Sequence, residues 1–125
     1  MSRPDWDLYF IKIAAEVATR ATCPRASVGA VIVKDNRILS TGYNGAPAGE
    51  EHCEDVGCLV ENDHCQRTIH AETNAIAFAA KYGISLDGAT MYVCDSMGRR
   101  ATPICHKCSQ LAKVAGIVRL CERGL

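Results

Sequence analysis

One histidine and two cysteines with the spacing of metal ligands constrain this chain more than any other feature. His70 begins a His-x-Glu segment, and Cys105 and Cys108 form a Cys-x-x-Cys segment much later in the chain. Each segment lies where a loop gives way to a predicted helix, and side chains three residues apart share one side of a helical turn. The three side chains can bind one ion if the two helices lie side by side. We therefore expect a fold in which these two helix starts converge.

A donor set of one imidazole and two thiolates is typical of zinc. A catalytic zinc site has three protein ligands and leaves the fourth tetrahedral position open to water. Glu72 follows His70 by two residues and is not needed as a ligand, so it can move protons to and from that water. A closed structural zinc site is the alternative, because Cys-x-x-Cys alone fits structural and redox sites equally well. The two segments together are typical of zinc-dependent nucleobase deaminases, in which water converts a ring C–NH2 into C=O.

The bulk properties narrow the class of partner. The 125 residues predict a single domain, 1–125, and the 14 basic and 14 acidic residues leave no net charge. A neutral chain has no broad basic surface for nucleic acid or membrane, which favours a small polar substrate. No targeting segment or membrane span is evident, so we expect a cytoplasmic protein. Eight cysteines in such a protein indicate metal ligation, because a disulfide framework would need a secretory context.

Apolar periodicity predicts strands that alternate with helices. An amphipathic helix is expected over residues 5–20, with an apolar face on one side. That face consists of Trp6, Phe10, Ile13 and Val17. Further helices are expected over 70–81 and 105–115, and strands over 28–33, 38–43, 89–94 and 117–120. The first two strands form a hairpin, and the first is apolar enough to be central. The order predicts an α/β sandwich with a partly parallel sheet.

Several segments beyond the zinc signature resemble one protein family. The run GYNGAPAG covers residues 42–49, HAETNAI covers 70–76, and GATMYV covers 88–93. With residues 28–33 and 115–117, these segments make the chain similar to the cytidine and deoxycytidylate deaminase superfamily. The resemblance is closest to the deaminases of deoxycytidine monophosphate (dCMP), because the GYNG run is particular to that branch.

The resemblance implies a three-layer α/β/α sandwich with a central mixed sheet of four to five strands, in a homo-oligomer, either hexamer or dimer. It implies zinc on His70, Cys105 and Cys108, and Glu72 as the catalytic proton shuttle. Asn44 and Ala71 are the implied substrate contacts, although Asn44 with its following glycine also suits a simple turn. The implied reaction is dCMP + H2O → dUMP + NH3. Alternatives are a nucleoside, a free base or a tRNA base as substrate, or an inactive zinc-stabilised scaffold.

The chain departs from the family pattern near the cysteines. Ile104 separates Pro103 from Cys105, and the loop over 95–102 is longer than usual. We also expect the chain to lack the family's C-terminal tail, which would follow residue 125. Arg99 and Arg100 in that loop are therefore candidates to bind the substrate phosphate, because arginine pairs with phosphate oxygens bidentately. The alternative is a solvated loop with two exposed arginines.

A second, structural zinc is expected in the irregular stretch over 44–67. Long loops in compact domains are usually functional or are ordered by a further interaction, such as a bound metal. Cys23 and Cys53 match positions that bind a structural zinc in some phage dCMP deaminases. The remaining ligands are expected among Cys58, His64 and Cys65, with only one of the last two binding. Reduced, half-buried thiols are the alternative.

Overall fold

The computed structural model describes residues 2–23, 26–47, 49–57, 60–61, 64–65, 69–101 and 103–125. Its main sheet has four strands, in the order β2-β1-β5-β6. The strands are β1 (Val28–Lys34), β2 (Arg37–Tyr43), β5 (Thr90–Asp95) and β6 (Arg119–Glu122). The long helices are α1 (Trp6–Ala18), α3 (Ala71–Lys81) and α4 (His106–Val114). Short elements lie between β2 and α3: α2 (Cys53–Val56), β3 (Val60–Glu61) and β4 (His64–Cys65).

The sheet is mixed, as predicted. Strand β1 pairs antiparallel with β2 and with β5, whereas β5 and β6 run parallel. The β1–β2 hairpin turns at Asp35 and Asn36, whose φ angles of 52° and 60° are left-handed, a conformation that Asp and Asn tolerate better than most residues. Strand β1 is buried along most of its length, which confirms its central position.

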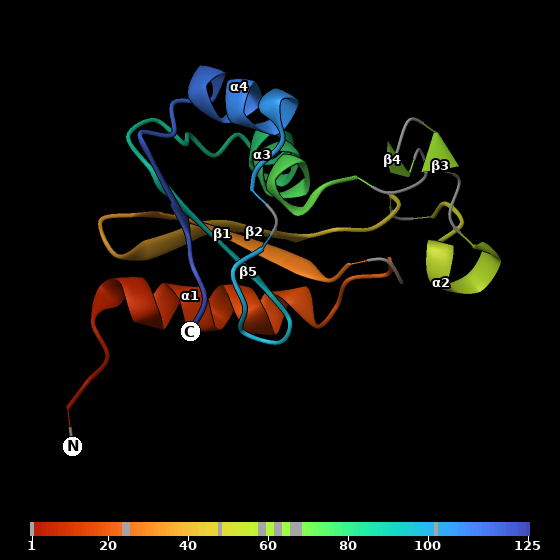
Figure 1. Ribbon diagram of the computed structural model, residues 1–125. Helices are drawn as coiled ribbons and strands as arrows, with labels where there is room; N and C mark the ends of the chain where they lie inside the picture. The colour runs from red at the N-terminus through yellow and green to blue at the C-terminus, as the bar shows by residue number, and fades with distance from the viewer. Residues whose placement is uncertain are drawn as a thin grey trace.

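Helices cover both faces of the sheet and make the predicted three-layer sandwich. Figure 1 shows α1 on one face, and α3 with α4 beside it on the other. One apolar core lies between the sheet and α1, and a second lies between the sheet and α3. Helix α3 buries Ala75, Ile76 and Ala79 against the sheet. Within the described residues, every helix is too short or too polar to cross a bilayer.

The buried face of α1 matches the predicted one at Phe10, Ile13 and Val17 and differs at Trp6. The helix buries Phe10, Ile11, Ala14, Ala15 and Ala18, whereas Trp6 is 55% exposed. The reason lies in β1, where a Cβ on Gly29 would overlap the backbone oxygen of Ala14 and lie 2.6 Å from the backbone nitrogen of Ala18. Helix and strand backbones touch at this glycine. Ala14, Ala15 and Ala18 therefore face the sheet, whereas the aromatic residues Trp6 and Tyr9 are exposed.

The last strand begins two residues later than predicted. The backbone nitrogen of Ile117 donates to the carbonyl of Ala112, and Gly116 has a φ of 97°, so Ile117 still belongs to the turn that ends α4. The strand is β6, and its last residue is Glu122. This shift places the Glu122 carboxylate at the end of an ordered strand.

The first turn of α1 is joined to strands β5 and β6 by Asp7. Its carboxylate accepts a hydrogen bond from the Tyr92 hydroxyl at 2.7 Å and forms an ion pair with Arg119 at 2.7 Å. The hydrogen bond from Arg119, followed by that from Tyr92, lowers the pKa of Asp7 to about 2. Because this pKa lies below the ordinary 3.8, the folded protein binds fewer protons here than the unfolded chain.

We expect Asp7→Asn to lower the free energy of unfolding by about 0.5–1 kcal/mol at pH 7, the range for solvent-screened ion pairs. The Asp7 and Arg119 side chains are 35% and 50% exposed, which limits the effect. The Asp7 contribution is complete above the unfolded pKa of 3.8 and is lost as the pH falls toward about 2. Urea unfolding at pH 7 and pH 3 checks this, with Asp35→Asn as the control for loss of one charge. A difference in unfolding free energy between the wild type and Asp7→Asn that is the same at both pH values would contradict this expectation.

Candidate active site

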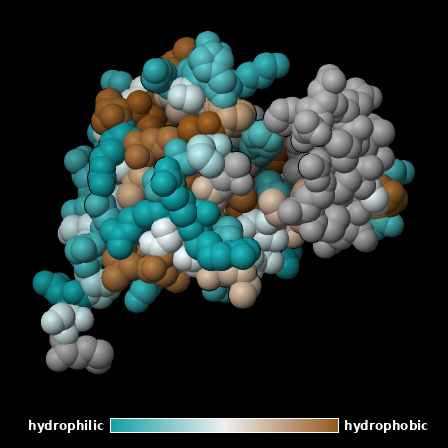
Figure 2. Space-filling model, in the orientation of Figure 1, coloured by the Kyte–Doolittle hydropathy of each residue, from teal (hydrophilic) through white to brown (hydrophobic). Residues whose placement is uncertain are grey.

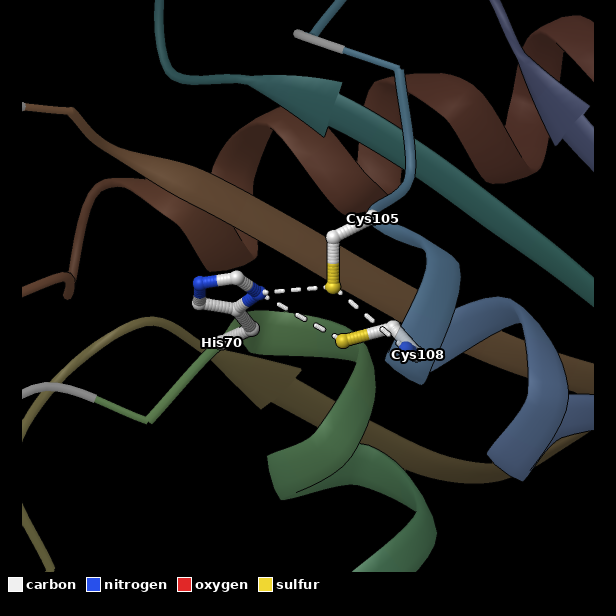
Figure 3. A group of neighbouring side chains, drawn as sticks. All are labelled: His70, Cys105 and Cys108. Carbon is white, nitrogen blue, oxygen red and sulfur yellow. Dashed lines mark hydrogen bonds between the residues drawn. The ribbon is translucent and has the colours of Figure 1, made fainter. Parts of the chain in front are cut away.

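The two helix starts converge, as the ligand spacing predicts. His70 is the N-cap of α3 and Cys105 is the N-cap of α4, while Cys108 is buried in the first turn of α4. The His70 Nδ1 lies 3.5 Å from the Cys105 Sγ and 3.4 Å from the Cys108 Sγ (Figure 3). Within the part of the chain that the structure describes, these three residues form the one cluster of His, Cys, Asp and Glu able to share an ion.

The spacing of the three donor atoms fits tetrahedral zinc. Zinc binds thiolate sulfur at about 2.3 Å and imidazole nitrogen at about 2.0–2.1 Å, which at a tetrahedral angle separates the two donors by about 3.5 Å. The observed separations between the His70 nitrogen and the two sulfurs are 3.4 and 3.5 Å. The donor set and its geometry therefore both suit zinc, and three ligands leave one tetrahedral position for water or substrate.

Polar groups from α3 and α4 contact the sulfurs of the two cysteines. Both cysteines lie at the N-terminal end of α4. The backbone nitrogen of Cys108 donates to the Cys105 Sγ at 3.4 Å. The Thr73 Oγ1, from the first turn of α3, lies 3.2 Å from the Cys108 Sγ. Sequence reasoning missed Thr73, because a threonine inside a helix carries no signal for a contact with another helix.

Glu72 is a buried carboxylate next to the metal-ligand cluster in sequence. It lies in the first turn of α3 and is 7% exposed. Burial raises its pKa, opposed by the backbone N–H of Glu72 itself and by the charge of His70. A raised pKa makes a carboxylate a better proton acceptor than an exposed one, which suits a general acid–base group. The group therefore has the environment of a proton carrier.

The predicted substrate-binding residues have different surroundings. Asn44 is buried, and its amide oxygen accepts from the Val28 nitrogen while its amide nitrogen donates to the Ala26 carbonyl, both at 2.8 Å. Asn44 thus orders the chain before β1. Ala71 is buried at the start of α3.

The two arginines lie on the loop after β5, and both are exposed. The Arg99 Nε donates to the Asp95 carboxylate at 2.9 Å, so its guanidinium is paired within the loop.

The candidates for a second zinc lie mostly outside the described residues. Cys23 is buried with a free thiol. Cys58 is outside the described residues, and so are the side chains of Cys53, His64 and Cys65. The structure therefore leaves the second site a prediction.

One further residue contacts the metal-ligand loop. The Glu122 carboxylate accepts a hydrogen bond from the backbone nitrogen of Ile104 at 3.0 Å. Ile104 immediately precedes Cys105 of the His70, Cys105 and Cys108 cluster. Sequence reasoning missed Glu122, because nothing in a glutamate near the end of a strand predicts a contact with a residue in another loop.

Comparison with known proteins places this site in a family. A sequence model described as the cytidine and deoxycytidylate deaminase zinc-binding region matches residues 4–121. The deoxycytidylate deaminase of Mycobacterium phage D29 is 40% identical over 96% of this chain and 95% of its own. ComE operon protein 2 of Bacillus subtilis is 54% identical over 74% of this chain, and the matched region spans about half (49%) of that relative.

A solved structure shares the same architecture. The dCMP deaminase of cyanophage S-TIM5, in complex with dCMP and dUMP, superposes with a TM-score of 0.74 at 28% identity. The match covers 96% of this chain and 82% of the phage enzyme. With the convergent His70, Cys105 and Cys108, these similarities show that the chain belongs to the cytidine and deoxycytidylate deaminase family, with the zinc-binding region of that family across nearly its whole length.

Proposed function

We propose that this chain is a zinc-dependent deaminase that hydrolyses dCMP to dUMP and ammonia. The observation that carries the proposal is the tetrahedral spacing of the His70 Nδ1 and the two cysteine sulfurs, with Glu72 buried two residues after His70. The choice of dCMP is supported by the phage D29 relative, which is named a deoxycytidylate deaminase, and by the S-TIM5 enzyme, solved with dCMP and dUMP.

The residues divide the chemistry between them. His70, Cys105 and Cys108 would hold zinc, which when bound lowers the pKa of a coordinated water to near 7 and so supplies a nucleophile at neutral pH. Glu72 accepts one proton as the water oxygen bonds to the ring carbon that bears the amine, and delivers it to the adjacent ring nitrogen. Glu72 then transfers the remaining hydroxyl proton to the amine. The C–N bond breaks, a C=O forms, and ammonia leaves, so all atoms balance.

We expect kcat/KM to be highest for dCMP in a panel that also contains CMP, deoxycytidine and cytidine, with ammonia release as the measurement.

Arg99 and Arg100 are the candidates for a phosphate contact, and Arg100 is exposed on the same loop as the Asp95-paired Arg99. The Arg99→Ala/Arg100→Ala double variant should then lower kcat/KM for dCMP more than for deoxycytidine. A preference of the wild type for a nucleoside would overturn the choice of dCMP. An unchanged ratio of kcat/KM for dCMP to kcat/KM for deoxycytidine in the variant would show that the arginines do not bind the phosphate.

A second, structural zinc remains part of the proposal. Its candidate ligands are Cys23, Cys53, Cys58 and one of His64 and Cys65. Cys23 supports it, because this buried thiol is not in a disulfide. A closed site with four protein ligands would order the segment between β2 and α3 without taking part in the reaction.

We also propose that the chain works as a homo-oligomer in the cytoplasm. Apolar side chains are exposed on α3 and α4, including Phe78, Tyr82 and Val114, of which Val114 is 87% exposed. Figure 2 shows apolar atoms at the surface near α4, within a mostly polar exterior. Such exposed apolar groups commonly mark contacts between protein subunits. The free thiols of Cys94 and Cys121 suit a reducing compartment.

A further inference from the structure

The backbone that precedes Cys105 is attached to the end of the sheet. Glu122 is the last residue of β6, and its Oε2 accepts a hydrogen bond from the Ile104 nitrogen at 3.0 Å across 18 positions of sequence. Both residues are half-buried. The strand that carries Glu122 is itself fixed, because β6 pairs with β5 and places Glu122 beside Val93. The carboxylate therefore offers the loop an acceptor at a fixed position.

This attachment bears on the metal ligand, because the contacts of Cys105 within α4 are made with residues that follow it in the chain. Its Sγ accepts from the Cys108 nitrogen and its carbonyl accepts from the Ser109 nitrogen, both contacts within the helix that follows. Cys105 has an extended conformation, with φ −68° and ψ 158°, which must be held for its thiolate to point toward His70. The Ile104–Glu122 hydrogen bond holds the preceding peptide, so the backbone is tied on both sides of the ligand.

A second contact joins the same loop to the chain that follows β6. The nitrogen of Leu125 donates to the carbonyl of Gly98 at 2.8 Å. The loop between β5 and α4 is therefore attached near its beginning through Gly98 and at its end through Ile104. Of these two attachments, the one to Ile104 lies next to a metal ligand.

We propose that Glu122 is a positioning residue for the zinc ligand Cys105, acting through its hydrogen bond to the Ile104 backbone. The proposal rests on the zinc site and not on the identity of the substrate. A hydrogen bond to an ionised carboxylate is stronger than a neutral one, and it is worth more where water is partly excluded. Partners that orient metal ligands typically contribute about 10- to 100-fold to metal affinity or activity.

The test compares three substitutions of Glu122 with one control. Glu122→Gln keeps an oxygen at the same reach, Glu122→Asp keeps the charge but shortens the side chain by one methylene, and Glu122→Ala removes the acceptor. Glu16→Ala, at an exposed position of α1, is the matched control for loss of a glutamate. Zinc dissociation constants are measured for the full chain by competition with a chromophoric chelator. We expect Ala and Asp to raise the dissociation constant by about 10- to 100-fold, Gln to raise it much less, and the control to leave it unchanged.

A spectroscopic readout separates positioning from a general loss of stability. In the cobalt-substituted protein at saturating metal, thiolate-to-cobalt charge-transfer absorption per ion should fall in Glu122→Ala and be retained in Glu122→Gln. A role in stability alone would shift urea unfolding and leave both the zinc dissociation constant and the cobalt spectrum as in the wild type, which would overturn the proposal. Equal zinc affinities for Gln and Ala would overturn it as well, because the hydrogen bond would then not be the cause.

The outcome is independent of the deaminase assignment. A wild-type protein that binds zinc but deaminates none of the nucleotides or nucleosides would overturn the proposed function and leave the role of Glu122 intact. Normal zinc affinity in all three variants, with full dCMP turnover in the wild type, would overturn the role of Glu122 and leave the proposed function intact.

Discussion

Replacing Glu72 by glutamine is expected to lower kcat for dCMP by about 10²- to 10⁴-fold, the usual contribution of a general acid–base group. The substitution keeps the size and hydrogen-bonding shape of the side chain but removes its ability to take a proton. Because Glu72 is buried in the first turn of α3, a nearly isosteric change should leave the packing around it intact. The fall in activity is measured as ammonia release at saturating dCMP.

The zinc content of the same variant gives the decisive comparison. Glu72 is not one of the three clustered donors, so Glu72→Gln should retain the zinc stoichiometry of the wild type. Glu16→Gln makes the same chemical change at an exposed position of α1 and should retain full activity. Turnover near the wild-type rate in a zinc-loaded Glu72→Gln protein would show that another group moves the protons.

Local chemistry explains why the metal-ligand cluster could be predicted from the sequence. Few residue types bind zinc. Cys105 and Cys108 are three residues apart at the start of a helix, which brings their side chains to one side of a turn, and His70 also lies at a helix start. The predicted convergence is confirmed because the two N-caps, His70 and Cys105, bring their donor atoms to 3.5 Å from each other. The hairpin was predictable for a similar reason, since turn residues and alternating apolar positions act over a few neighbours.

The parts that could not be predicted depend on contacts between distant segments. The face that α1 buries was predicted only in part: Phe10, Ile13 and Val17 do pack against the core, but Trp6 is exposed. The difference arises because Gly29, in another element, lets the helix backbone approach and brings its alanines against the sheet. Glu122 contacts Ile104 across 18 positions of sequence and Thr73 contacts Cys108 across 35, and neither residue type indicates such a role. Asn44 belongs to a recognisable run, yet its amide hydrogen bonds with Ala26 and Val28 depend on the fold around β1.

Removing one metal ligand is expected to abolish the catalytic zinc and with it the activity. In Cys108→Ala the buried first turn of α4 keeps its backbone, but the site retains only one imidazole and one thiolate. Partners that merely orient ligands contribute about 10- to 100-fold, so loss of a ligand should lower zinc affinity and turnover by more than about 100-fold. Cys94→Ala is the matched control, because Cys94 is also buried, lies in β5 and is outside the metal-ligand cluster. It should keep both zinc and turnover.

The zinc count of Cys108→Ala also separates the two proposed sites. Protein purified without chelator is expected to contain two zinc ions per chain, and Cys108→Ala should contain one, because the segment around Cys23 and Cys53 would keep its own. Cys23→Ala should show the complementary loss, with reduced resistance to urea but a catalytic zinc still bound, since Cys23 is not in the cluster with His70. A wild-type protein with one zinc ion per chain, and a Cys108→Ala protein with none, would overturn the proposal of a structural zinc and support the catalytic one. Unchanged zinc and unchanged turnover in Cys108→Ala would contradict the assignment of the ligands themselves, because no hydrolytic zinc site could then depend on that thiolate.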